Sequence, residues 1–68
     1  MRFCIETEQE IDGRWIAEIA DLPGVLVYGS SENEAKANAY ALALRVIADE
    51  VEKSKSVPPL ISVHCASA

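Results

Sequence analysis

The stretch that decides the fold is Gly29-Ser30-Ser31-Glu32-Asn33-Glu34-Ala35, where a strand pattern gives way to a helix pattern. Ser31 and Glu34 have the spacing of a capping box. In such a box the Ser31 hydroxyl accepts from the Glu34 backbone N–H, and the Glu34 carboxylate reaches back to the N–H of Ser31. Glu32 and Glu34 also place negative charge at the positive end of the helix dipole. The stretch therefore predicts a helix that begins at residue 32.

One long helix is predicted over residues 32–53. Residues 35–53 contain no Gly or Pro, and they are rich in the strong helix formers Ala and Leu. At 1.5 Å per residue the helix spans roughly 33 Å, whereas a strand of five to seven residues reaches only about 17–23 Å. Its C-terminal half is therefore expected to extend past the sheet, with Ile47 and Val51 covered by another chain; the alternative is a short or frayed helix. The apolar face, at three- and four-residue spacings, comprises Ala35, Ala39, Leu42, Ala43, Val46, Ile47 and Val51.

Two alternating segments before the helix are predicted to form a hairpin. Residues 2–9 and 14–19 alternate between apolar and polar side chains, and Asp12-Gly13 lies between them. A two-residue loop would place Phe3 on the same face as Arg14, whereas a three-residue loop gathers the apolar side chains on one face. The three-residue loop is therefore predicted, with Gly13 in the left-handed region. It pairs Glu10 with Arg14, Gln9 with Trp15, Thr7 with Ala17 and Ile5 with Ile19.

Two further strands are predicted on either side of the helix. Residues 20–24, which contain Pro23-Gly24, form a loop, and residues 25–28 form a third strand. Val25 and Val27 are expected to face the helix, which leaves Leu26 and Tyr28 on the other face. After the helix, residues 54–59 form a connector that ends in two prolines, and residues 60–65 form the final strand.

Composition restricts the classes of function. The 68 residues are 50% hydrophobic and 25% charged, which predicts one soluble globular domain over residues 1–68, and so short a chain favours homo-oligomerisation. No apolar run approaches the roughly 20 residues of a membrane span, so no membrane association is expected and a cytoplasmic location follows. Six basic and eleven acidic residues give a net charge of −5, which argues against nucleic-acid binding by this chain alone. The acidity favours a basic partner, or it serves solubility.

The reactive side chains do not form a catalytic or metal-binding pattern. Cys4 and Cys65 form no CxxC motif, and His64 beside Cys65 is too little for a zinc site. The two cysteines are expected to be reduced, with a disulfide as the alternative if the terminal strands are neighbours. Two-metal hydrolysis needs several converging carboxylates; Glu6 or Glu8 could supply one, but residues 60–65 contain no acid. No enzymatic activity, cofactor or metal is therefore predicted.

An ordered series of short motifs resembles the HicB family of antitoxins. The family pattern is roughly DG-x-[YW]-hydrophobic-A, then P-D-LPG, then G-[DE]-T-x-x-EA. The likeness runs from residue 1 into the final strand, with Ala20 in place of the usual Pro and Ser30-Ser31 in place of the usual acidic-Thr pair. The matching segments are Asp12-Gly13-Arg14-Trp15-Ile16-Ala17-Glu18-Ile19-Ala20-Asp21-Leu22-Pro23-Gly24, Tyr28-Gly29 and Ser31-x-x-Glu34-Ala35.

The resemblance implies both a fold and a function. The fold is α+β, a β-β-β-α-β unit with strand order 3-2-1-4 and one long helix on one face, which is a partial ribonuclease-H-like arrangement. The implied function is to bind and mask a HicA-type toxin, a small basic protein that cleaves mRNA. Many family members carry a C-terminal helix-turn-helix or ribbon-helix-helix for operator binding. Neither is present in these 68 residues, so DNA binding by this polypeptide is not expected.

The candidate partner-binding residues lie on the face of the sheet that the helix leaves uncovered. An acidic stripe would attract a basic toxin, and an apolar centre with Tyr28 as its main anchor would supply the affinity. The alternative is an ordinary solvated outer face. The predicted function is therefore an antitoxin-like binding module, with a solitary homo-oligomeric structural or regulatory adaptor as the alternative. The predicted binding residues are Glu6, Glu8, Ile16, Glu18, Leu26 and Tyr28, and Glu10 extends the acidic stripe.

Overall fold

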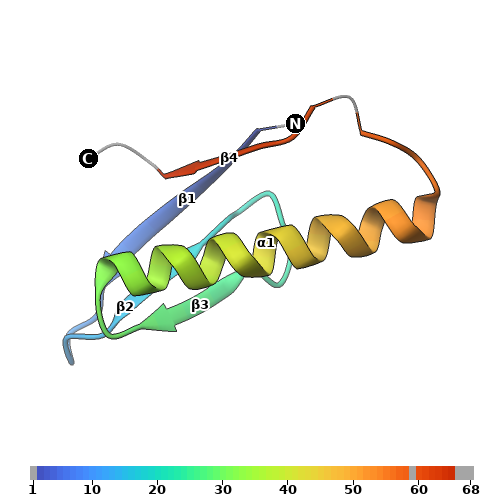
Figure 1. The fold of residues 1–68 in the computed structure, drawn as a ribbon. Coiled ribbons are helices and arrows are strands. Elements are labelled where there is room, and N and C mark those ends of the chain that lie inside the picture. Colours follow the sequence, from blue (N-terminus) through green and yellow to red (C-terminus); the bar gives the residue numbers. More distant parts are fainter. Residues whose placement is uncertain (1, 59, 66–68) are drawn as a thin grey trace.

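The computed structural model describes residues 2–58 and 60–65, which form a four-stranded mixed sheet with one helix on one side (Figure 1). The sheet has the order β3-β2-β1-β4. β1 pairs antiparallel with β2 and parallel with β4, and β2 pairs antiparallel with β3. This confirms the predicted α+β fold and strand order. The elements are β1 (Arg2–Gln9), β2 (Trp15–Glu18), β3 (Leu26–Gly29), α1 (Glu32–Ser54) and β4 (Ser62–Cys65).

The hairpin between β1 and β2 has the predicted register. Gln9 lies opposite Trp15, and the three-residue loop is closed by a 2.7 Å hydrogen bond from the Glu10 N–H to the Arg14 carbonyl. Gly13 has a φ of +94°, a conformation that a residue with a Cβ rarely adopts. The four predicted strands keep their order, and β1 has the predicted bounds. The ends of β2 and β3 differ from the prediction by one residue, and β4 begins at residue 62 instead of 60.

The capping box at the start of α1 is present, with one difference from the prediction. The Ser31 hydroxyl accepts from the Glu34 N–H at 3.1 Å, as predicted. The Glu34 carboxylate, however, accepts from the backbone N–H of Ser30 at 2.8 Å and from the Ser30 hydroxyl at 3.3 Å, not from Ser31. One carboxylate oxygen therefore holds two donors of Ser30. Glu32 accepts from the Thr7 hydroxyl at 2.9 Å, which ties the first turn of α1 to β1.

The end of α1 lies one residue beyond the prediction, at Ser54. Lys55 follows in the left-handed conformation, with a φ of 57°, and its N–H donates to the Val51 carbonyl at 2.9 Å. This bond satisfies one of the carbonyls that a helix end leaves without a partner. The cap positions the connector that returns to β4.

Ser31→Ala is expected to destabilise the protein by about 1 kcal/mol, because the helix loses the side-chain acceptor for the Glu34 N–H. Urea unfolding followed by far-UV circular dichroism measures the loss. Ser31→Asp keeps an acceptor at the same position and is the control, with most of the stability retained. An equal loss in both variants would contradict a capping role for the hydroxyl.

The core lies between α1 and the sheet, and much of it consists of alanine. Small side chains let the helix backbone lie close to the strands. Leu42, Val46 and Val51 are only partly buried. The centre of the packed helix face is therefore not the predicted line through Leu42 and Val46 but the neighbouring row of side chains. The buried residues are Phe3, Ile5, Ala17, Ile19, Val25, Ala35, Ala39, Ala43 and Ile47.

Candidate functional site

The side of the sheet opposite α1, called the open face below, carries the predicted binding residues. α1 lies on the other side, and Figure 1 shows no helix over this one among the described residues. Leu26 and Tyr28 have the predicted orientation, since they are 51% and 43% exposed while Val25 between the sheet and α1 is 2% exposed. Two rows cross the strands side by side: Glu6 opposite Glu18 and Glu18 opposite Leu26, then Glu8 opposite Ile16 and Ile16 opposite Tyr28. The structure thus brings all six predicted residues onto one surface.

Acidic side chains dominate the part of the open face over β1 and β2. Glu6 and Glu18 lie directly opposite each other, and like charges in that position repel. A hollow of about 210 Å³ lies between the acidic side chains, and its lining comprises Glu6, Thr7, Glu8, Glu10, Ile16 and Glu18. Among residues 2–58 and 60–65, the ion pairs involve other carboxylates and leave these four glutamates unpaired. The hollow therefore favours the approach of an external cation.

Arg14 contacts Tyr28 at the apolar end of the open face, an interaction that the sequence did not predict. Its guanidinium carbon lies 4.7 Å from the centre of the Tyr28 ring, within the range of a cation–π contact. The same guanidinium pairs with the Asp12 carboxylate at 2.8 Å. The pKa of Asp12 is lowered first by the hydrogen bond from the Arg14 backbone N–H at 3.1 Å, and also by the guanidinium. In the sequence, the spacing of Asp12 and Arg14 was the one sign that the two side chains could pair.

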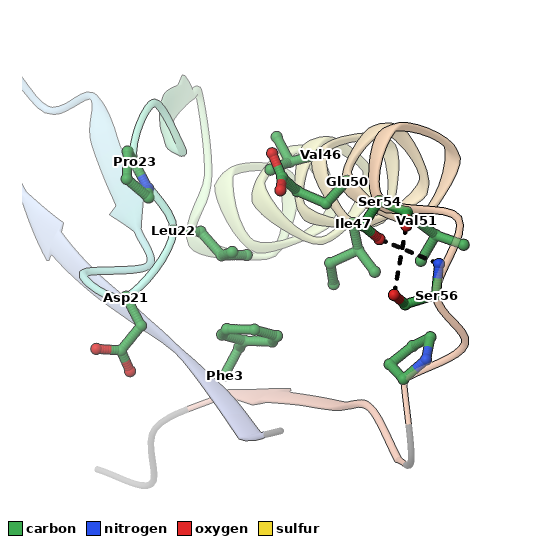
Figure 2. A pocket seen from close by; sticks show the side chains of 11 residues that line it. Phe3, Asp21, Leu22, Pro23, Val46, Ile47, Glu50, Val51, Ser54 and Ser56 are labelled. Atoms are coloured by element: carbon green, nitrogen blue, oxygen red, sulfur yellow. Dashed lines mark hydrogen bonds between the residues drawn. The ribbon is translucent and has the colours of Figure 1, made fainter.

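An apolar groove opens under the C-terminal half of α1, at the end of the molecule away from the capping box (Figure 2). It encloses about 600 Å³ between the helix, the 21–23 loop and the segment that follows the helix. Phe3 and Leu22 lie across it from Ile47, which is only 8% exposed. The expectation that Ile47 needs cover from another chain is therefore wrong, because Phe3 on β1 and the 21–23 loop reach under the extended part of the helix. Val51 remains partly buried.

The groove has few polar groups that could fix a ligand. Ser54 and Ser56 are bonded to each other, the Ser56 N–H donating to the Ser54 hydroxyl at 3.3 Å and the Ser56 hydroxyl to the Ser54 carbonyl at 3.4 Å. The carboxylates of Asp21 and Glu50 lie at the rim. Specific sites combine an apolar lining with a few convergent polar groups, and here the polar groups satisfy one another or point to solvent.

The two cysteines face opposite sides of the sheet. β4 does lie beside β1, but Cys4 is opposite His64 whereas Cys65 is opposite the buried Ile5. Residues opposite each other in a sheet point to the same side, so Cys4 and His64 are on the open face and Cys65 is on the helix side. Both thiols are free, and the disulfide alternative is excluded by this register.

No other chemistry-bearing cluster emerges from the part of the chain that the structure describes. Within residues 2–58 and 60–65, no three His, Cys, Asp or Glu side chains are grouped so that they could hold a metal ion. None of the helical residues described forms a helix long and apolar enough to cross a membrane. Of the open face and the groove, only the open face combines charge with apolar anchors.

The chain was compared with protein-family models, with curated proteins and with solved structures, and none of them matches it. The likeness to the HicB family therefore rests on the ordered motifs of the sequence.

Proposed function

We propose that this chain is a protein-binding module that docks its open face onto a basic protein. The observation that carries the proposal is the pairing of an unneutralised acidic hollow with exposed apolar side chains on the same surface. Interfaces draw most of their energy from a few aromatic and apolar anchors, while complementary charges speed encounter and fix orientation. Tyr28 and Leu26 are the anchors in this arrangement, and Glu6, Glu8 and Glu18 are the charges.

The partner we propose is a small basic mRNA-cleaving toxin of the HicA type, which the chain would neutralise by direct binding. Two features support this choice. The motif series from Asp12 to Ala35 resembles HicB antitoxins, and a net charge of −5 suits a partner whose own substrate is a polyanion. An acidic surface that covers a basic RNA-binding surface would compete directly with the RNA phosphates.

Affinity purification of the tagged full chain from its native host tests the proposal. We expect a small basic protein to be recovered with the chain at a stoichiometric ratio, and to be lost in high salt. Recovery of the chain alone, as a pure homo-oligomer, would contradict the antitoxin function and would favour the alternative of a solitary structural or regulatory adaptor.

Glu6→Lys is expected to slow association with a basic partner several-fold and to reduce its dependence on salt, because it reverses one charge of the acidic hollow. Stopped-flow or surface plasmon resonance measurements at two or more salt concentrations report both effects. Glu52→Lys, which changes the same charge on the exposed side of α1, is the matched control. If the two variants bind with the same rate and salt dependence, the acidic hollow is not where the partner docks.

A further inference from the structure

Among the described residues, α1 leaves the β4 edge of its side of the sheet uncovered. Neighbouring strands lie about 4.8 Å apart and packed helices about 8–10 Å apart, so one helix covers about two strands and a four-stranded sheet takes two helices. α1 packs against β3, β2 and β1, and β4 lies at the far edge of the sheet (Figure 1). Val63 and Cys65 of β4 face the helix side, since they are opposite the buried Phe3 and Ile5. They are half-buried and exposed, respectively.

α1 also carries a second apolar strip, turned away from its packed face. We call it the outer stripe; it comprises Ala37, Tyr40, Ala41, Leu44 and Ala48. Its two large members, Tyr40 and Leu44, are 42% and 49% exposed. A hollow of about 540 Å³ runs between the outer stripe and Cys65, and Lys36 is the one charged residue that lines it. The same molecule thus has an unpartnered helix stripe beside an uncovered strip of sheet.

We propose that a second copy of this chain fills that space, with the two α1 helices side by side between two sheets. In this arrangement a two-fold axis places the α1 of each copy over the β4 side of the other sheet. A second copy fits this space because it supplies a helix with an exposed apolar stripe. Its own stripe and sheet need the same cover from the first copy. The large side chains of Tyr40 and Leu44 also meet small ones, Ala37 and Ala41, which allows close helix packing.

The distribution of charge supports self-association through this side. Two chains that each carry a net charge of −5 repel each other, so a dimer must form where acidic side chains are sparse. The hollow beside the outer stripe has Lys36 as its one charged lining residue, whereas the hollow of the open face is lined by Glu6, Glu8, Glu10 and Glu18. The proposed dimer keeps both acidic faces on the outside, where each remains accessible to a partner.

Specific dimer interfaces bury about 800 Å² per partner, which is roughly a sixth of the 4754 Å² surface of this chain. The outer stripe runs roughly 17 Å along the helix axis. Each copy would bury its outer stripe and also the helix-side face of its β4. Each of these two surfaces is therefore counted twice in the total buried area of the dimer.

Sedimentation equilibrium of the full chain tests the proposal. We expect a dimer of twice the 7.4 kDa chain mass at micromolar concentration, and we expect Leu44→Glu to raise its dissociation constant at least tenfold. Leu26→Glu is the matched control, because Leu26 is equally exposed but lies on the open face. Far-UV circular dichroism checks that both variants keep their fold. A monomeric wild type, or a dimer that Leu26→Glu disrupts and Leu44→Glu does not, would overturn the proposal.

The native thiols give a second, independent readout. In the proposed dimer Cys65 is covered by the partner's helix, whereas Cys4 lies on the open face and is unaffected. Maleimide labelling of Cys65 should therefore be several-fold slower in the wild type than in Leu44→Glu, with the same Cys4 rate in both. Equal Cys65 rates would contradict the proposed interface. Neither result depends on a toxin, so this proposal and the antitoxin function can fail separately.

Discussion

Gly29→Ala is expected to destabilise the protein by about 3 kcal/mol, the largest effect that we predict for a single methyl group. A Cβ at residue 29 would lie 2.5 Å from the backbone nitrogen of Ala35 and 2.9 Å from its Cα. These are backbone atoms, so no side-chain rotation relieves the contact. The first turn of α1 would have to move away from β3, which disturbs the capping of Ser31 and the packing of Ala35. In a chain of this size, whose core supplies about 3–5 kcal/mol, the variant should be largely unfolded.

Urea unfolding with Trp15 fluorescence and far-UV circular dichroism measures the effect of Gly29→Ala. Gly24→Ala is the matched control, because a Cβ there meets nothing within 4 Å and the cost comes only from its φ of +87°. That cost is about 1–2 kcal/mol. If Gly29→Ala loses no more stability than Gly24→Ala, the helix is not held this close to β3.

The predictable parts of the fold are those that short sequence patterns determine. Apolar and polar side chains alternate in both strands beside Gly13, and a three-residue loop keeps the apolar ones of both strands on one face. A loop longer or shorter by one residue would expose Phe3 and Ile5. The start of α1 follows from Ser31 and its spacing to Glu34. The resemblance to the HicB family supplied the strand order, in particular the return of β4 beside β1.

The parts that were missed depend on which atoms meet across the fold. The Glu34 carboxylate bonds to Ser30 instead of Ser31, and nothing in the spacing distinguishes these neighbours. Ile47 is covered because Phe3 and Leu22 reach under the extended helix. The comparison of helix length with strand length did not take the 21–23 loop, which contains Leu22, into account. The cation–π contact joins Arg14, which precedes β2, to Tyr28 of β3 in a different row of the sheet, so it required the register of both strands.

Among the candidate site residues, the sequence predicted positions but not their surroundings. Alternation alone places Glu6, Glu8 and Glu18 on one face. That Glu6 stands opposite Glu18, and that no cation neutralises them within the described chain, is visible only once the strands are in register. Likewise, the uncovered side of β4 depends on which strands α1 crosses, and a sequence gives the length of a helix but not its lateral position.

Tyr28→Ala is expected to weaken binding of the proposed basic partner by at least about 2 kcal/mol, which is roughly thirtyfold in the dissociation constant. Tyr28 is suited to be the anchor because its ring is half exposed and already held by the Arg14 guanidinium, so little side-chain freedom is lost on binding. Its row also contains Ile16 directly beside it on β2, and Glu8 one strand further on β1, so an apolar contact and then a charge extend the same surface. Isothermal titration calorimetry with the purified partner measures the change.

Tyr40→Ala provides the matched control for Tyr28→Ala. The two tyrosines are 42% and 43% exposed, but Tyr40 lies on the outer stripe of α1, on the opposite side of the molecule from the open face. Removal of Tyr40 should weaken dimerisation and leave the affinity for the basic partner within about twofold. Removal of Tyr28 should weaken binding of the basic partner and leave dimerisation unchanged. Tyr28→Phe keeps the ring and should keep most of the affinity. Equal losses from Tyr28→Ala and Tyr40→Ala would show that the partner is not recognised through the open face, because two side chains on opposite surfaces cannot both be the anchor of one contact.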